Sequence, residues 1–219
     1  MRTLALTLLT TVAWAAGSKR PTALEIELDI VTRLTNTTNR QSTTETQNHR
    51  IWIRGNRVRR EERSIAGTEV LIEADGMQFL FSPEAKKGLK RKVDKPSART
   101  DYPEYFDPQG FREWIEKTGA KKSGSERVNG VDCEVYTQSE GPATLKRWLR
   151  KDNGMPMKNA VEARPADAPH TVTTMKITRV KVGGTISDSL FQAPKGYEYK
   201  EVKDEEPPKD EAKGKGKKN

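Results

Sequence analysis

The chain has 219 residues, a formal net charge of +9, a mean hydropathy of −0.86 and only 33% hydrophobic residues. This composition provides for one modest hydrophobic core and excludes two large ones, so we expect a single domain. One cysteine, Cys133, excludes an intramolecular disulfide.

The N-terminus has the pattern of a secretory signal. Arg2 supplies the positive charge, residues 4–14 form a short apolar run, and Ala13-Trp14-Ala15 is a small-x-small cleavage site. A membrane anchor or a buried helix is the alternative, but the run is far shorter than the roughly 20 residues a span needs, and threonines interrupt it. We therefore expect cleavage near Ala15 and a soluble periplasmic or secreted protein.

The rest of the chain divides by composition. Residues 16–200 carry nearly all the remaining apolar side chains and are expected to form one folded domain. From residue 201 to residue 219 the chain is mainly Lys, Glu, Asp, Pro and Gly, which predicts a disordered charged tail.

The first half of the domain reads as a series of strands. Residues 24–30 alternate apolar and acidic side chains without a fault, and residues 50–54 alternate again. Between them, the Thr-rich residues 32–48 fit either a long extended hairpin or a mobile loop. The basic run 57–63 alternates too weakly to define a face. Asp75-Gly76 predicts a hairpin turn between residues 70–72 and 78–81, and residues 89–93 form a further strand.

One helix is predicted with both of its ends. Asp107 is placed as the N-cap, Pro108 takes the first helical position, and Gly119 ends the helix. Phe111, Trp114 and Ile115 recur at helical spacing, so this aromatic stripe is expected to pack on the sheet. The preceding residues 101–108 read as a loop.

The second half centres on residues 126–158. Val131, Cys133 and Val135 alternate with polar residues after the turn Asn129-Gly130, which predicts a half-buried strand. A second strand runs over residues 144–151 to the turn Asp152-Asn153-Gly154, and a third begins near residues 155–157. Residues 171–182 form the last long strand, which Gly183-Gly184 ends.

No group of residues in the sequence has a catalytic pattern. There is no phosphate-binding glycine loop, no pair of histidines at metal spacing and no GxSxG motif. Cys133 falls on an apolar strand face, which favours a buried, inert thiol over a nucleophile that would need a basic partner such as His49 or His170. We therefore expect no enzymatic activity, no cofactor and no metal.

The arginines near Trp52 predict an electropositive strip. Because an exported protein rarely meets nucleic acid, we expect no nucleic-acid partner. The charge instead suits an anionic membrane surface or an acidic protein, and the residues expected to bind it are Arg54, Arg57, Arg59 and Arg60.

The order of these motifs resembles a known family. A regular first strand, a DG hairpin followed by FLFSPEAKK, a short helix, VNGVDCEVY, RWLRKDNGMPMK and the closing SDSLFQAPKGYE are similar to the outer-membrane lipoprotein carrier superfamily, the LolA/LolB-like proteins. The resemblance covers about residues 22 to 200. It implies a mainly β fold with some α structure: an antiparallel sheet curled into an unclosed half-barrel, with a lid helix over an apolar cavity.

The resemblance also implies a function. We expect a monomeric, carrier-like periplasmic protein that binds lipid or the acyl chains of a lipoprotein. The alternative is a protein-interaction or sensor module of the same fold, with a barrel filled by its own side chains. The residues expected to line the apolar site are Ile26, Leu28, Ile53, Ile72, Phe79, Phe81, Trp114 and Trp148.

Overall fold

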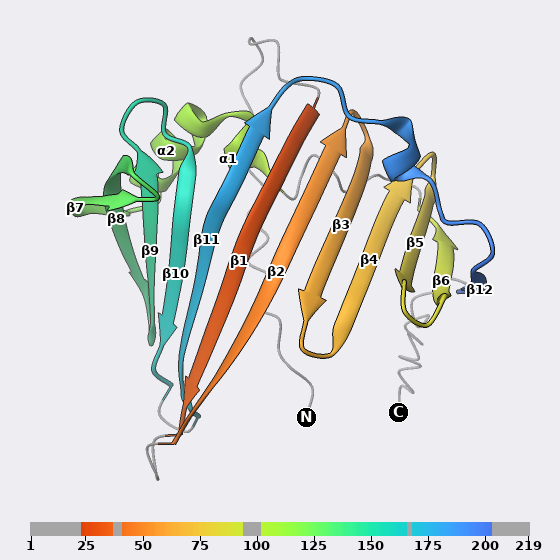
Figure 1. The fold of residues 1–219 in the computed structure, drawn as a ribbon. Helices are drawn as coiled ribbons and strands as arrows, with labels where there is room; N and C mark the ends of the chain where they lie inside the picture. The colour runs from red at the N-terminus through yellow and green to blue at the C-terminus, as the bar shows by residue number, and fades with distance from the viewer. Residues whose placement is uncertain (1–22, 37–40, 94–101, 166–167, 203–219) are drawn as a thin grey trace, which may run out of the picture.

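A computed structural model describes residues 23–36, 41–93, 102–165 and 168–202. These residues form one twelve-stranded sheet with the strand order β12-β6-β5-β4-β3-β2-β1-β11-β10-β9-β8-β7 (Figure 1). Neighbouring strands are antiparallel, except that β12 runs parallel to β6. The sheet is open, since β7 and β12 lie at its two edges.

The first half of the chain is a meander. Two long strands, β1 (Ala23–Thr35) and β2 (Ser42–Arg54), pair along their whole length. They are followed by β3 (Arg57–Ser64), β4 (Gly67–Ala74), β5 (Met77–Ser82) and β6 (Lys87–Lys92). The turn between β4 and β5 has positive φ at both Asp75 and Gly76, as a tight hairpin requires.

The second half returns to the middle of the sheet. Two short helices, α1 (Pro103–Phe106) and α2 (Pro108–Lys117), precede a second meander of β7 (Lys121–Val128), β8 (Val131–Glu140), β9 (Ala143–Arg150) and β10 (Pro156–Ala163). The last long strand, β11 (His170–Val182), pairs with β1 and so joins the two meanders.

The sheet is covered on both sides. We call the side that carries α1 and α2 the helix side and these two helices the lid. On the opposite side, residues 183–202, which we call the strap, cross from β11 toward β5 and β6 (Figure 1). The strap contains a 3₁₀ helix, η1 (Asp188–Phe191), and ends in β12 (Glu198–Glu201).

Most of the predicted elements are confirmed. The strands predicted around residues 24–30, 50–54, 131–135, 144–151 and 171–182 are present, and Asp107 caps α2 by accepting a hydrogen bond from the Gly110 N–H at 2.9 Å. Of the two interpretations of residues 32–48, the extended hairpin is the one observed for its described part, which reaches Thr35 and resumes at Ser42.

Several expectations need correction. The basic run 57–63 is a regular strand, β3, whose Val58 is buried. Residues 103–106 of the expected loop form the one-turn helix α1. The strap strand β12 continues through Glu201, one residue into the range predicted as a disordered tail. The signal segment and the remainder of the tail lie outside the described residues.

Candidate functional site

The helix side carries a sealed apolar core beneath α1. Tyr105 of α1 is only 2% exposed, and it packs with buried side chains of three central strands. Those side chains share one face because directly paired residues of neighbouring strands point to the same side of a sheet. The members contributed by the central strands are Leu24, Ile26, Leu28, Ile51, Ile53 and Ile177.

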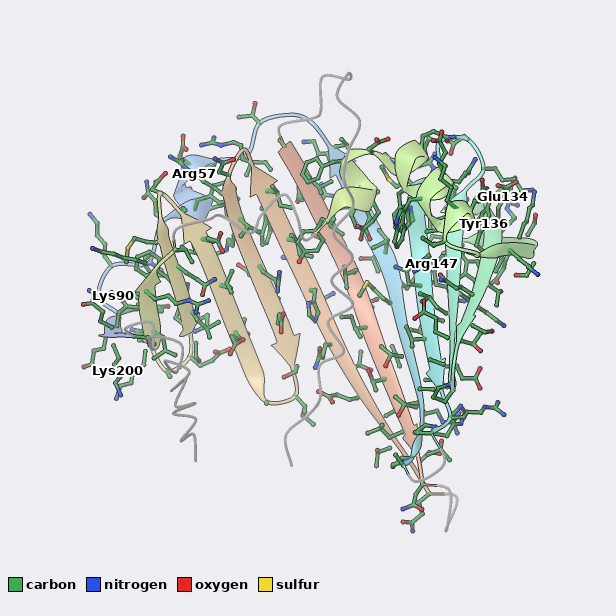
Figure 2. All side chains as sticks on the ribbon, turned by 180° about the vertical axis from the view of Figure 1, so that it is seen from behind. Arg57, Lys90, Glu134, Tyr136, Arg147 and Lys200 are labelled. Atoms are coloured by element: carbon green, nitrogen blue, oxygen red, sulfur yellow. The ribbon has the colours of Figure 1, made fainter. Side chains whose placement is uncertain are left out.

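The same face continues beyond the lid as a partly exposed strip. Ile30 and Met175 are paired across β1 and β11, and both pack against the sealed core. Val161 and Leu145 are paired across β10 and β9, and Val161 lies across from Thr173, two residues from Met175 on β11. Leu34 of β1 is 43% exposed. We call these five apolar residues the apolar strip. Figure 2, seen from the helix side, shows the lid over one end of the sheet only.

A polar cluster lies on the helix side between the lid and the apolar strip. Arg147 is paired with Asn159 of β10 and with Tyr136 of β8 (Figure 2). Its Nη1 donates to Gln138 Oε1 at 3.1 Å, and its guanidinium lies 6.0 Å from the centre of the Phe111 ring in α2.

The two charged members of this cluster are both affected by burial. Burial raises the pKa of the Glu104 carboxyl to about 7, while the nearby charge of Arg147 opposes that rise. Burial also lowers the pKa of Arg147. The Asn159 Oδ1 atom is buried and accepts no hydrogen bond from a described residue. The cluster therefore holds a carboxyl group, a guanidinium and an amide on three partly buried residues.

Polar contacts fasten α2 to strand β8. The Tyr136 hydroxyl donates to Glu116 Oε1 at 2.7 Å, and Arg112 lies 3.7 Å from the Glu134 carboxylate. Lys122 donates to Glu134 at 2.5 Å, and this hydrogen bond holds the pKa of Glu134 below its usual value. The fixed point of the lid is thus α2, whereas α1 is held mainly by its buried aromatic side chain.

The expected basic strip is divided between the two sides of the sheet. On the opposite side, Arg54 and Arg57 both pair with Asp188 of the strap, and Arg59 pairs with Glu61. Arg59 also donates to the Leu190 carbonyl oxygen at 3.2 Å. Arg60 points to the helix side, where it lies 5.7 Å from the Tyr102 ring centre. The four arginines therefore do not form one surface, and three of them bind charged or polar groups of this chain.

The eight residues expected to line one apolar site are also divided. Ile26, Leu28 and Ile53 lie in the sealed core, and Trp114 packs on the helix side with Ile115 and Leu149. The expectation is wrong for the other four as lining of the same site, because they point to the opposite side of the sheet. There Ile72, Phe79 and Phe81 pack beneath the strap, and Trp148 packs near Cys133.

Cys133 is enclosed by apolar side chains. It is fully buried with Val128, Trp148 and Met157, and burial raises its pKa. His49 points to the helix side, where it lies 3.6 Å from Glu62, so it faces away from Cys133. The described ranges contain no group of three or more His, Cys, Asp or Glu residues arranged to hold a metal ion.

Sequence reasoning missed the residues that define the helix side. Tyr105 and Glu104 fall in the segment whose sequence predicts a loop, and no motif in the sequence singles out Leu145, Val161 or Met175. The alternation of residues 143–147 and 159–163 could have indicated a face, but it could not show that this face continues the one formed by Leu24 and Ile26.

Comparisons with known proteins give a fold likeness only. No protein-family profile and no curated protein matches the chain. Similar solved structures include an uncharacterized conserved protein from Thermus thermophilus, with 9% identity and a TM-score of 0.46, covering 81% of this chain and 91% of that one. The MucA/MucB complex of Pseudomonas aeruginosa has 14% identity and a TM-score of 0.43 over 84% of this chain, which spans 62% of that chain.

Similar structures also include a protein named as a LolA superfamily member. This is NE2245 from Nitrosomonas europaea, with 10% identity and a TM-score of 0.33, covering 77% of this chain and 90% of that one. At these identities and TM-scores, the likenesses say nothing about ligand or partner. No helix among the described residues is both long and apolar enough to cross a membrane.

Proposed function

We propose that the protein is a non-enzymatic binder of apolar chains, the acyl chain of a lipid or of a lipoprotein, and that it acts in the periplasm or outside the cell. The apolar chain of the ligand is taken up on the helix side of the sheet. One observation carries this proposal: the sealed core extends on the helix side through the partly buried Ile30 and Met175, and the other apolar side chains of the strip lie further along the same face, among Thr32, Thr173 and the polar cluster. An exposed apolar face of this kind is a common mark of a binding surface.

The lid provides a route into the core. Helix α1 has only four residues, and it closes the core mainly through Tyr105. Such a short helix has little stability of its own, since most helical stability comes from packing. Displacing α1 would join the sealed core to the apolar strip, and the two together would accept a longer chain.

A second candidate function is a protein-interaction or sensor module with a filled barrel. The observation that favours it is the near-complete burial of Tyr105 against the core residues, which fills the space beneath α1. The substitution Tyr105→Ala separates the two candidates. It should alter the uptake of an apolar chain, but it should leave the docking of a protein on the outer surface unchanged.

A matched pair of variants tests the leading proposal. Leu34 and Val31 lie three residues apart on β1, are 43% and 37% exposed, and point to the helix side and the opposite side respectively. In delipidated protein, Leu34→Asp should weaken binding of a fluorescent fatty-acid analogue about tenfold, since it places a charge on the apolar strip. Val31→Asp should change the affinity for the same analogue less than twofold.

Two results would count against the proposal. One is the absence of saturable binding by folded wild-type protein, and the other is an equal loss of binding in both variants. Circular dichroism of both variants controls for folding, and neither position is buried.

A further inference from the structure

Arg147 is a partly buried cation with few partners in this chain. Among the described residues, its guanidinium makes one hydrogen bond, to Gln138, although it can donate five. Glu104 and Glu140 act on it only as nearby charges, because within the described ranges no ion pair within 4 Å joins either carboxylate to Arg147. A guanidinium that is largely removed from water is stabilised by a closer anionic partner.

The surroundings of Arg147 are those of a small polar site at the end of an apolar surface. Asn159 lies directly across from it with a buried Oδ1 atom that has no partner among the described residues, and Phe111 of the lid covers the guanidinium. Leu145 and Val161 of the apolar strip follow on the same face two residues further along β9 and β10. One molecule with a charged end and an apolar chain would contact both regions.

We propose that Arg147 binds the anionic head group of an amphiphile, a carboxylate or a phosphate, whose apolar chain lies on the apolar strip. This inference rests on the proposed function and names the ligand class for it. Glu104 of the lid then supplies the anionic group that faces Arg147 while the site is empty, and the head group takes its place when α1 is displaced. Carboxylates and phosphates are the groups that a guanidinium binds in a bidentate manner.

The protonation state of Glu104 favours the replacement of its carboxyl group by the head group of the ligand. With its pKa raised to about 7, its carboxyl is only partly ionised near neutral pH, so it compensates the charge of Arg147 incompletely. A head group with an ordinary acidic pKa remains ionised at that pH and competes favourably.

The test compares two amphiphiles of equal chain length, dodecanoate and dodecanol, on the full protein. Wild type should bind dodecanoate more tightly, and Arg147→Gln should weaken dodecanoate binding about tenfold or more while changing dodecanol binding less than threefold. Arg147→Lys should retain part of the preference for dodecanoate over dodecanol. Glu104→Gln leaves Arg147 in place and should tighten dodecanoate binding, which keeps the test decisive if Arg147→Gln does not fold.

The other outcomes are equally informative. If Arg147→Gln and Glu104→Gln leave the preference for dodecanoate unchanged, or if wild type shows no preference, the head-group site is wrong although the proposed function stands. If wild type binds neither amphiphile, both proposals fail. If inorganic phosphate or acetate alone binds as tightly as dodecanoate, the site takes a free anion and the amphiphile is rejected.

Discussion

The carboxyl group of Glu104 shows how position determines chemistry at the scale of one residue. The same residue type at Glu134 has a lowered pKa, because Lys122 donates a hydrogen bond to it at the edge of the lid. Glu104 lies in α1 of the lid, where burial outweighs the attraction of Arg147 and raises its pKa from 4.5 to about 7. A single turn of helix therefore carries a group that titrates near neutral pH.

The substitution Glu104→Gln tests this directly. Between about pH 4.5 and pH 7 the folded protein retains the Glu104 proton that the unfolded chain has lost, so stability from this group is full below pH 4.5 and is lost as the pH rises through 7. The wild type should therefore lose up to about 3 kcal/mol in free energy of unfolding, relative to Glu104→Gln, between pH 4 and pH 8. Urea titrations of both proteins at each pH measure this free energy of unfolding.

A control variant isolates burial as the cause. Glu113→Gln changes an exposed glutamate of α2 and should follow the wild-type pH profile. If the wild-type and Glu104→Gln profiles run parallel across the range, the carboxyl of Glu104 is not shielded as described.

At the scale of one element, the strap depends on two arginines that meet one carboxylate. Asp188 of η1 accepts from both Arg54 and Arg57, and Arg54 also donates to the Ile186 carbonyl oxygen at 2.7 Å. These contacts hold the strap over a core that includes Val70, Ile72 and Phe81. The arginine-rich sequence of β2 and β3 is thus explained by packing within the chain.

Asp188→Asn should loosen the strap without unfolding the sheet. Because the Asp188 side chain is 63% exposed, we expect a modest cost of about 1 kcal/mol, together with faster amide hydrogen exchange over the described strap. Asp132→Asn breaks the more exposed pair with Arg127 and should cost less than about 0.5 kcal/mol. Equal effects of the two variants would show that Asp188 does not hold the strap.

The turn between β9 and β10 places its glycine against the lid. Gly154 has φ +76°, and a Cβ atom there would lie 2.8 Å from the Pro108 carbonyl oxygen. Gly130, with φ +78°, has open space around it. Gly154→Ala should therefore destabilise the protein by at least about 1 kcal/mol more than Gly130→Ala does, since only the former adds a clash to the same backbone strain. Thermal unfolding of the pair measures this, and equal costs would contradict the close approach.

At the scale of the whole molecule, local patterns predicted the strands but not the side to which each one points. Alternation predicted the apolar face of residues 24–30, and the turn Asp75-Gly76 predicted a strand over residues 78–81; both strands carry apolar side chains that pack in a core. The two sets of side chains lie on different sides of the sheet, because the pairing from β1 through β5 places Ile26 and Phe79 on opposite faces. Since both sides of this sheet are covered, only the register determines which strands share a core.

Two elements, β7 and α1, have no sequence pattern from which they could be predicted. Strand β7 lies at an edge, and seven of its eight residues are exposed, so it lacks the alternation of a half-buried strand. Helix α1 is a single turn, too short for a helical repeat. The resemblance nonetheless predicted an unclosed, mainly antiparallel sheet with a lid, and the open sheet is observed.

The central claim, that the helix side takes up an apolar chain, is tested most directly by photocrosslinking. Strands β9, β10 and β11 present alternate residues to the two sides, so each peptide from them contains an internal control. A fatty acid carrying a diazirine in its chain should crosslink to Leu145, Val161 and Met175. An excess of the same fatty acid without the diazirine should abolish this crosslinking. Labelling of Trp148 and Lys158 instead, or labelling that does not saturate, would contradict the account.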